Sequence, residues 1–275
     1  MTEWLKSGNT AVITGGANGI GLAAAERYMS RGMNVVIADT NAEALDAISL
    51  EGDGKLIKIV CDVTSLEQVE ALKSRTLDEF GRIDCLMNNA GAAVTRAKPW
   101  EDIDGWKKQL DINLWGIIHG CHAFVPVMME AGHRSVVINT GSKQGLTNPP
   151  GGFAYNLSKA GVVNYTQSLA HALREEPDCP VSAHLLVPGL TYSNMIARFV
   201  PEKPPGAWTC DQVIDYMLSA LDDDAFYIIC PDNETPAALD HRRMQWNLDD
   251  IIVGRPALSR WHPDFAEDFA SFVGE

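Results

Sequence analysis

Seven short apolar runs rich in β-branched residues recur along the chain, and helical patterns separate most of them. Runs of about four to eight apolar residues bounded by turn signals are typical of buried strands. Alternation of such strands with helices predicts an α/β chain: a single Rossmann-type, doubly wound parallel sheet of about seven strands with helices on both faces. The runs lie at 10–14, 34–38, 55–60, 83–87, 135–140, 181–187 and 225–230. The helical patterns extend to residue 31 after the first run and then cover 65–80, 99–131, 153–175, 211–222 and 264–273.

The totals exclude several classes of protein. A chain of 275 residues, 46% hydrophobic and 21% charged, is long enough for one large domain with a substantial core. A net charge of −14 and the lack of a basic cluster argue against nucleic-acid binding. Neither a signal peptide nor a run near the roughly 18 apolar residues of a membrane span is recognisable. Six scattered cysteines fit a reducing cytoplasm, and the seven histidines show no metal-binding pattern.

The first apolar run leads into a glycine-rich turn, Thr14-Gly-Gly-Ala-Asn-Gly-Ile-Gly21, which precedes a helical pattern. Strand, glycine loop and helix are the setting in which such a motif binds a dinucleotide, because the helix N-terminus attracts the diphosphate. Gly15 permits the tight turn, Gly19 lets the backbone approach the diphosphate, and Gly21 lets helix and sheet pack closely. The spacing is G-x-x-x-G-x-G rather than G-x-G-x-x-G.

Asp39 ends the second run, 20 residues after Gly19. A carboxylate at about that offset typically binds the adenosine ribose, and it repels the 2′-phosphate of NADP. No Arg or Lys lies within the glycine loop. We therefore predict NAD as the cofactor in preference to NADP. The alternative interpretation is a helix N-cap or turn aspartate.

Two further strand ends carry polar or small residues. After the third run, Asp62 could accept a hydrogen bond from an adenine amino group and Val63 could pack on its ring, although Asp62 is equally well placed to cap the next helix. Asn88-Asn-Ala-Gly91 follows the fourth run and allows close approach of a flat ligand. Taken alone, that turn has no functional meaning.

Ser142, Tyr155 and Lys159 carry the candidate chemistry. Tyr155 and Lys159 are four residues apart, so a helix places them on one face. A phenol has a pKa of about 10, and a nearby ammonium lowers it. Ser142 follows the fifth run, so strand end and helix could bring the three side chains together. This trio suits proton transfer to or from an alcohol or carbonyl oxygen, although Tyr-x-x-x-Lys also occurs in ordinary amphipathic helices.

Asn113 interrupts the helical pattern at 99–131, where asparagine is mildly unfavourable. Three interpretations are open: Asn113 faces solvent, it holds a water, or it marks a local helix break near the centre of the sheet.

Ligands of doubly wound sheets bind outside the carboxyl ends of the strands. The glycine loop, both aspartates, the Asn-Asn-Ala-Gly turn, Ser142 and Pro188-Gly189 all fall at this one edge, which favours a shared site.

These positions together resemble the classical short-chain dehydrogenase/reductase family over roughly 10–230. The resemblance implies a catalytic tetrad. Tyr155 would be the general acid/base, Ser142 would orient the substrate oxygen, and Lys159 would lower the Tyr155 pKa and bind the nicotinamide ribose. Asn113 would hold a water that relays protons to Lys159. The matching residues are Thr14-Gly-x-x-x-Gly-x-Gly21, Asn88-Asn-Ala-Gly91, Asn113, Ser142, Tyr155-x-x-x-Lys159 and Pro188-Gly189.

Motifs and resemblance together give a set of cofactor-binding residues. Thr191 and Ser193 match the segment that receives the nicotinamide carboxamide. The family usually has threonine where Ser193 stands, and serine keeps the hydroxyl. The set is Gly15, Asn18, Gly19, Ile20, Gly21, Asp39, Asp62, Val63, Asn89, Gly91, Tyr155, Lys159, Thr191 and Ser193.

The same comparison suggests the domain organisation. We assign 1–232 to a Rossmann-fold dinucleotide-binding and catalytic domain with a substrate lid at about 190–210. The family's glycine-rich ending is absent. Residues 233–275 instead form a C-terminal extension that we expect to pack on its own domain or on a neighbouring subunit. The family commonly forms homodimers and homotetramers, with helices 99–131 and 153–175 as the expected contacts.

The leading hypothesis is an NAD-dependent oxidoreductase that interconverts a secondary alcohol and a ketone by hydride transfer. Lys143 could bind an anionic substrate group, but a solvated lysine is the simpler interpretation. A catalytically silent NAD-sensing regulatory protein is the rival, and the intact tetrad argues against it. A second rival is a dehydratase or epimerase of the extended branch, which would need the spacing G-x-x-G-x-x-G that this glycine loop does not show.

An apolar small-molecule substrate is expected from aromatic residues in segments that border the pocket: Trp100, Phe153, Tyr192, Phe199 and Trp208.

Overall fold

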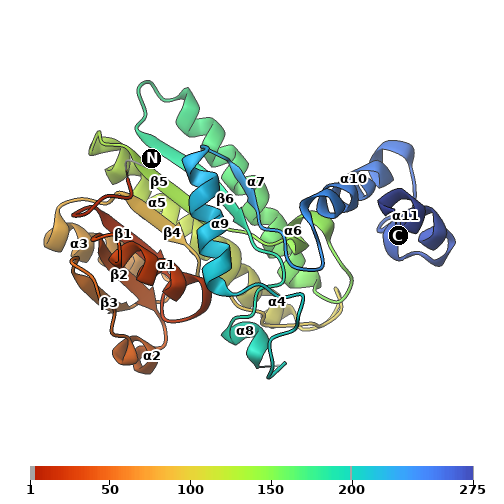
Figure 1. Ribbon diagram of the computed structural model, residues 1–275, viewed down its shortest axis with the longest axis horizontal. Helices are drawn as coiled ribbons and strands as arrows, with labels where there is room; N and C mark the ends of the chain where they lie inside the picture. The colour runs from red at the N-terminus through yellow and green to blue at the C-terminus, as the bar shows by residue number, and fades with distance from the viewer. Residues whose placement is uncertain (1–3, 199, 275) are drawn as a thin grey trace.

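A computed structural model describes residues 4–198 and 200–274 of the chain. Within them, seven strands form one parallel sheet in the order β3-β2-β1-β4-β5-β6-β7 (Figure 1). The predicted doubly wound sheet is thereby confirmed. The strands are β1 (Thr10–Thr14), β2 (Asn34–Asp39), β3 (Leu56–Val60), β4 (Cys85–Asn88), β5 (Ser135–Thr140), β6 (Val181–Val187) and β7 (Tyr227–Ile229).

The helices cover both faces of the sheet and continue past its last strand. The α-helices are α1 (Gly19–Met29), α2 (Ala42–Ala47), α3 (Leu66–Phe80), α4 (Ile103–Leu110), α5 (Gly116–Glu130), α6 (Gln144–Thr147), α7 (Phe153–Glu175), α8 (Asn194–Ala197), α9 (Cys210–Asp222), α10 (Ala237–Val253) and α11 (Ala266–Val273). A π-helical turn, η1 (Asp111–Trp115), joins α4 to α5, and two 3-10 turns, η2 (Ser259–Trp261) and η3 (Pro263–Phe265), precede α11.

Alternation along the strands divides the core into two layers. Ala11 and Ile13 of β1 pack with α1 and α9 on one face of the sheet. Val12 lies between them in sequence and packs with α3, α5 and α7 on the other face. Because side chains alternate across a strand, each β1 residue contributes to only one layer. Both layers are mainly apolar, and the buried amides of Asn88 in β4 and Asn139 in β5 are joined by a hydrogen bond of 2.9 Å.

The long helical pattern predicted at 99–131 is wrong as one continuous helix. It divides into α4, η1 and α5, and Asn113 lies in the π-helical turn between them. Among the described residues, 103–130 is the one helical stretch long and apolar enough to cross a membrane. Half of its most apolar window is buried against the rest of the fold. We therefore interpret it as a core helix of this α/β domain.

The order of the strands places a crevice at the centre of the sheet. β1 pairs with β2 on one side and with β4 on the other. The chain thus winds outward in opposite directions from β1 and β4, and their carboxyl ends flank the switch point where ligands of such sheets bind. The glycine loop follows β1, and the Asn-Asn-Ala-Gly turn begins at the end of β4.

The C-terminal extension contains a long helix, α10, that the sequence patterns did not predict. Its core is formed by Trp246 with Phe269 and Val273 of α11. The Trp246 indole N–H donates to Ser259 Oγ at 2.8 Å, and the Arg255 guanidinium lies 3.8 Å from the centre of its ring. Figure 1 shows α10 and α11 standing beside the sheet and its covering helices. The extension is thus a small helical lobe at the carboxyl-end side of the domain.

Candidate active site

Two glycines in the loop after β1 adopt backbone conformations that favour glycine. Gly15 has a φ of 64° and Gly19 a φ of 59°, both in the left-handed region. A Cβ on Gly21 would lie 2.4 Å from the Gly15 carbonyl oxygen. Gly21 therefore lets α1 contact the glycine loop itself, a closer approach than the helix-to-sheet packing expected from the sequence.

The N-terminus of α1 fits an anionic ligand. Asn18 is the N-cap residue, but its side chain makes no capping hydrogen bond, and the first turn contains no acidic residue. Ile20 packs against the core layer on that face. The first N–H groups of a helix have no partner within it and attract negative charge. A dinucleotide diphosphate is the expected ligand of this loop.

Asp39 joins the end of β2 to the glycine loop. One carboxylate oxygen accepts a hydrogen bond from the Ala17 N–H at 3.2 Å, and the other accepts from the Asn41 N–H at 3.0 Å. The N-cap of α2 is Asn41, so Asp39 does not cap that helix, but its bond with the Asn41 N–H two residues on is the contact of a turn aspartate. The carboxylate remains partly exposed at the edge where a ribose would lie.

Asp62 and Val63 lie in different environments at the end of β3. Asp62 Oδ1 accepts from the Thr64 N–H at 2.9 Å and from the Thr64 hydroxyl at 2.8 Å. Ser65 caps α3, so the helix-cap alternative for Asp62 is also wrong. Val63 is buried, and a Cβ on Gly116 would lie 2.6 Å from its Cγ2 atom. The Val63 side chain thus packs beneath α5.

Asn89 holds the ends of β1 and β4 together. Its side-chain N–H groups donate to the carbonyl oxygens of Thr14 at 3.2 Å and Gly15 at 3.1 Å. In return, the Thr14 hydroxyl accepts from the backbone N–H groups of Asn89 and Ala90 at 3.0 and 3.1 Å. Asn89 therefore shapes the crevice through protein contacts, whereas Gly91 is exposed beside it.

Asn113 is fully buried, so the solvent-facing interpretation is wrong and the local helix break is observed. Its Oδ1 accepts from the Ala92 N–H at 2.8 Å, and its Nδ2 donates to the Ala92 carbonyl and to Ser158 Oγ at 3.1 Å each. A Cβ on Gly91 would lie 3.5 Å from Asn113 Oδ1 and 3.7 Å from Lys159 Nζ. The side chains of Asn113 and Lys159 therefore both lie close to the exposed Gly91.

Ser142, Tyr155 and Lys159 meet between the end of β5 and α7. A hydrogen bond joins the side chains of Tyr155 and Ser142. Ser142 Oγ also accepts from the Gln144 N–H at 3.2 Å. Lys159 Nζ lies 5.8 Å from the centre of the Tyr155 ring and donates to the Thr140 carbonyl at 2.8 Å. The structure thus brings together the hydroxyl, phenol and ammonium that the spacing predicts.

Burial favours the neutral forms of both titratable groups. It raises the pKa of Tyr155, and the hydrogen bond with Ser142 opposes that rise. Lys159 is 3% exposed, and burial lowers its pKa from 10.5 to about 8. The expectation that Lys159 lowers the Tyr155 pKa is therefore wrong for this structure. The Lys159 ammonium contacts the Thr140 carbonyl, and burial is the largest cause of the rise in the Tyr155 pKa.

The segment after β6 folds over the glycine loop. Thr191 is buried and forms a parallel bridge with Trp208. Its hydroxyl donates to the Gly189 carbonyl at 3.3 Å. Ser193 is the N-cap of α8, and a Cβ on Gly19 would lie 3.4 Å from the Ser193 Cβ. Of the two residues predicted to receive the carboxamide, Ser193 thus borders the loop predicted to bind the diphosphate, whereas Thr191 contacts Gly189 and Trp208.

Comparison with known proteins identifies the family. Residues 9–204 match the family described as short chain dehydrogenase. The chain belongs to this family. Its matched relatives include dehydrogenases and reductases, which supports an oxidoreductase, and the family uses nicotinamide cofactors.

Individual relatives match most of the chain. It is 37% identical over 194 residues to 3beta-hydroxysteroid dehydrogenase 2 of Eggerthella lenta, covering 69% of this chain and 73% of that protein. It is 32% identical over 216 residues to 2-dehydro-3-deoxy-L-rhamnonate dehydrogenase (NAD(+)) of a Sphingomonas species, covering 78% and 81%. A Burkholderia phymatum short chain dehydrogenase/reductase, solved in complex with NAD, matches with a TM-score of 0.80 and 29% identity over 93% of this chain and 98% of its own.

The ion pairs of Lys143 in this short-chain dehydrogenase were not predicted from the sequence. Lys143 is neither solvated nor free for an anionic substrate, because its ammonium pairs with Asp232 at 3.3 Å and Asp240 at 2.5 Å. The side chains of all three are largely buried. The acidic partners are distant in sequence and lie in segments without a motif, so no local signal pairs them with Lys143.

The aromatic residues expected around the substrate pocket differ in exposure. Trp100 is 79% exposed, and Trp208 is held in place by its indole N–H, which donates to Asn233 Oδ1 at 3.1 Å. Phe153 and Tyr192 are partly buried. Phe199 lies outside the described residues. Of the residues from 4 to 198 and 200 to 274, no three His, Cys, Asp or Glu side chains could jointly hold a metal ion.

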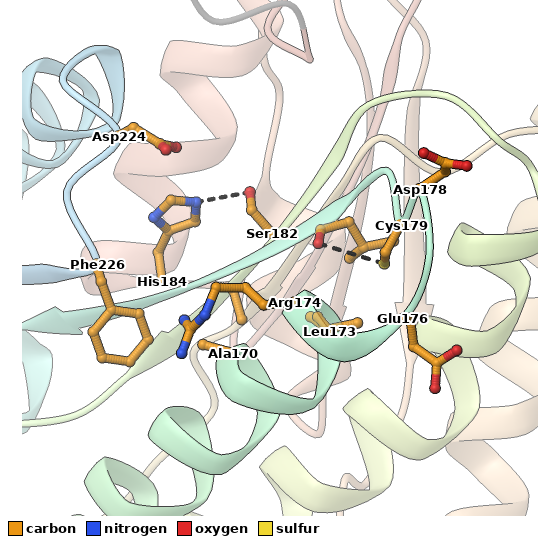
Figure 2. A pocket seen from close by; sticks show the side chains of 12 residues that line it. Ala170, Leu173, Arg174, Glu176, Asp178, Cys179, Ser182, His184, Asp224 and Phe226 are labelled. Atoms are coloured by element: carbon orange, nitrogen blue, oxygen red, sulfur yellow. Dashed lines mark hydrogen bonds between the residues drawn. The ribbon is translucent and has the colours of Figure 1, made fainter.

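A cavity of about 420 Å³ lies at the amino end of β6, away from the carboxyl-end site (Figure 2). His184 Nδ1 is 2.9 Å from the Ala225 carbonyl, so Nδ1 carries the proton and Nε2 accepts from the Ser182 hydroxyl at 2.9 Å. Burial lowers the His184 pKa, which keeps the ring neutral. The Ser182–His184 pair joins β6 to the segment that leads into β7 and is separate from Tyr155.

Proposed function

We propose that this short-chain dehydrogenase interconverts a secondary alcohol and a ketone, with NAD as its cofactor and Tyr155 as general acid/base. The observation that carries the proposal is the meeting of Ser142, Tyr155 and Lys159, with Lys159 beside Gly91 of the Asn-Asn-Ala-Gly turn. When bound, NAD supplies the hydride acceptor. The protein residues orient the alcohol and move its proton.

Each side chain has a role that its contacts support. The Tyr155 hydroxyl exchanges a proton with the substrate oxygen, and Ser142 donates a hydrogen bond that orients the same oxygen. Lys159 uses one of its three N–H donors on Thr140, which leaves donors for the ribose hydroxyls. Asn113 uses both amide hydrogens on protein atoms, so we assign the water-holding role to its backbone carbonyl in the π-helical turn.

NAD is favoured over NADP because of Asp39. Its carboxylate is fixed by the Ala17 and Asn41 N–H groups at the edge of the glycine loop. A second negative charge from a 2′-phosphate would be repelled there. The rhamnonate dehydrogenase relative is named for NAD(+), and the Burkholderia relative was solved with NAD.

The substrate is proposed to be a small, apolar alcohol. The relative named for 3beta-hydroxysteroids makes steroid alcohols the first compounds to test. The purified chain would be assayed with steroids, aromatic carbinols and aliphatic secondary alcohols, with NAD and NADP in parallel. Reduced-cofactor absorbance is the readout.

Tyr155→Phe is the decisive variant. We expect turnover to fall by about 10²–10⁴-fold with NAD binding retained, because only the exchangeable proton is removed. Tyr165→Phe is the matched control, since it removes a phenol about 15 Å further along α7 and should leave turnover unchanged. Equal turnover in parent and Tyr155→Phe would refute the role of Tyr155. NAD binding without turnover on any alcohol would instead favour the sensing hypothesis.

We also infer a cytoplasmic homodimer or homotetramer without nucleic-acid or membrane partners. Ile103, Trp115 and Leu157 are 67%, 50% and 51% exposed along α4, η1 and α7, the helices expected to form subunit contacts. The six cysteines are free thiols, as a reducing compartment favours. Light scattering of the purified protein would determine the number of subunits.

A further inference from the structure

The Lys143 ion pairs connect three segments at the candidate active site. Lys143 directly follows Ser142 and precedes α6. Asp232 follows β7, and Asp240 lies in the first turn of α10 in the C-terminal extension. The relative exposures of the Lys143, Asp232 and Asp240 side chains are 15%, 9% and 6%. An ammonium and two carboxylates so buried are costly to separate, because removal of the ammonium leaves both carboxylates unpaired.

The turn after β6 is held by the Asp232 carboxylate and by the backbone of Lys143. Asp232 Oδ2 accepts from the Leu190 N–H at 3.4 Å, and the backbone N–H of Lys143 donates to the Pro188 carbonyl at 3.3 Å. A Cβ on Gly189 would lie 2.8 Å from Asp232 Oδ2 and 3.0 Å from Lys143 Nζ. Glycine at this position therefore makes room for the Lys143–Asp232 pair as well as for the turn.

Helix α10 contacts the serine loop at a second point. The Asn247 side chain donates to the Leu146 carbonyl of α6 at 3.3 Å. Asp240 and Asn247 are seven residues apart and so lie on the same face of α10. This face, and not an isolated side chain, docks on the short helix that follows Ser142.

The pKa values of the two carboxyl groups shift in opposite directions. Burial opposes ionisation of Asp232, but the Lys143 ammonium and hydrogen bonds from Thr235 and Leu190 outweigh it and lower the Asp232 pKa. Burial raises the pKa of Asp240, and contact with Lys143 opposes that rise. Lys143 is thus the one group that lowers the pKa of both acids among the causes of their shifts.

We propose that Lys143 is a positioning residue for Ser142: through Asp232 and Asp240 it locks the serine loop to the Gly189 turn and to α10 of the same chain. The C-terminal extension thereby helps to hold the Ser142 hydroxyl against Tyr155. The inference rests on the proposed function, since it assigns the lock a role in catalysis.

The test compares Lys143→Met, Lys143→Arg and Asp240→Asn in the full chain, with Lys107→Met on exposed α4 as the matched control. The kcat for alcohol oxidation is measured per NAD-binding site. A purely structural role lowers the number of such sites and leaves kcat per site unchanged. We expect kcat per site to fall about 10- to 100-fold in Lys143→Met, because a displacement of about 1 Å can have that effect. Lys143→Arg should recover part of the loss.

Asp240→Asn preserves the Lys143–Asp232 pair and is the variant to use if Lys143→Met does not fold. We expect hydrogen–deuterium exchange to accelerate in both 142–147 and 237–247, with a smaller fall in kcat per site. Unchanged exchange in 142–147, or an unchanged kcat per site, would overturn the inference. A parent protein that oxidises no alcohol would refute the proposed function, and the exchange of the two segments would still test the lock.

Discussion

Lys159→Met is expected to remove activity while making the fold more stable at pH 7. Lys159 is 3% exposed, and its described hydrogen bond runs to the Thr140 carbonyl at 2.8 Å. Its ammonium has no nearby carboxylate among the groups that shift its pKa, and burial alone accounts for the shift. A buried charge without a counter-ion destabilises the folded state.

The size of the effect follows from the pKa. A fall from 10.5 to about 8 means that the charged lysine costs about 3 kcal/mol of folding free energy below pH 8, at about 1.4 kcal/mol per pH unit. Methionine has similar length and no charge, but it loses the hydrogen bond to Thr140, worth about 1 kcal/mol. The net gain of about 2 kcal/mol corresponds to a rise in Tm of roughly 4 °C for a chain of this size.

The stability of the parent protein should rise with pH, and this direction distinguishes the prediction. Between pH 8 and 10.5 the native lysine is neutral while the unfolded lysine stays protonated, so the parent gains stability as pH rises through this window. The advantage of Lys159→Met should therefore be largest near pH 7 and vanish near about pH 10. Calorimetry or urea unfolding at both pH values is the assay. Lys107→Met, at a side chain 69% exposed, is the control and should change little at either pH.

Two outcomes would refute this reasoning. If Lys159→Met is less stable than the parent at pH 7, the contact with Thr140 outweighs the buried charge. If its advantage is the same at both pH values, the lysine is not the group responsible.

Two further substitutions test the cofactor site. Asp39→Asn keeps the shape and removes the charge, so the NADP-to-NAD ratio of kcat/KM should rise by about tenfold, or ~1.4 kcal/mol; a ratio unchanged in parallel assays would make Asp39 a turn residue only. Gly21→Ala places a methyl group 2.4 Å from the Gly15 carbonyl oxygen and 2.7 Å from Asn89 Nδ2. It should destabilise the fold by about 1–3 kcal/mol in urea unfolding and weaken NAD binding in a fluorescence titration. Normal NAD affinity in that variant would show that the loop can adjust.

The sheet could be predicted because its determinants are local. Each buried strand appears as a short run of β-branched residues, and the helices between them fix the parallel order. The edge that carries the site follows from the same topology, since the glycine loop, Ser142 and the Pro188-Gly189 turn each end a strand. Those predictions needed only the position of each residue relative to its own strand.

Other features could not be predicted because they depend on contacts between distant segments. The partners of Lys143 lie about 90 residues or more further along the chain, Asp232 after β7 and Asp240 in the C-terminal extension, and the local sequence around Lys143 indicates only a loop. The direction of the Tyr155 pKa depends on how deeply α7 packs, which residue spacing does not report. The sequence left three alternatives open for Asn113; full burial excludes the solvent-facing one, and the π-helical turn shows the helix break.

Two unfavourable features of this molecule lie side by side at the edge that carries the candidate site. They are the π-helical turn at Asn113 and the buried ammonium of Lys159, and both Asn113 Oδ1 and Lys159 Nζ lie close to Gly91. Each is unfavourable in isolation, and proteins retain such features where the surrounding structure holds them for a function. If Lys159→Met is more stable and inactive, as expected, the chain keeps a destabilising residue at the place where proton transfer is proposed. NAD binding retained in that inactive variant would assign Lys159 to proton transfer, whereas loss of NAD binding would assign it to the ribose hydroxyls alone.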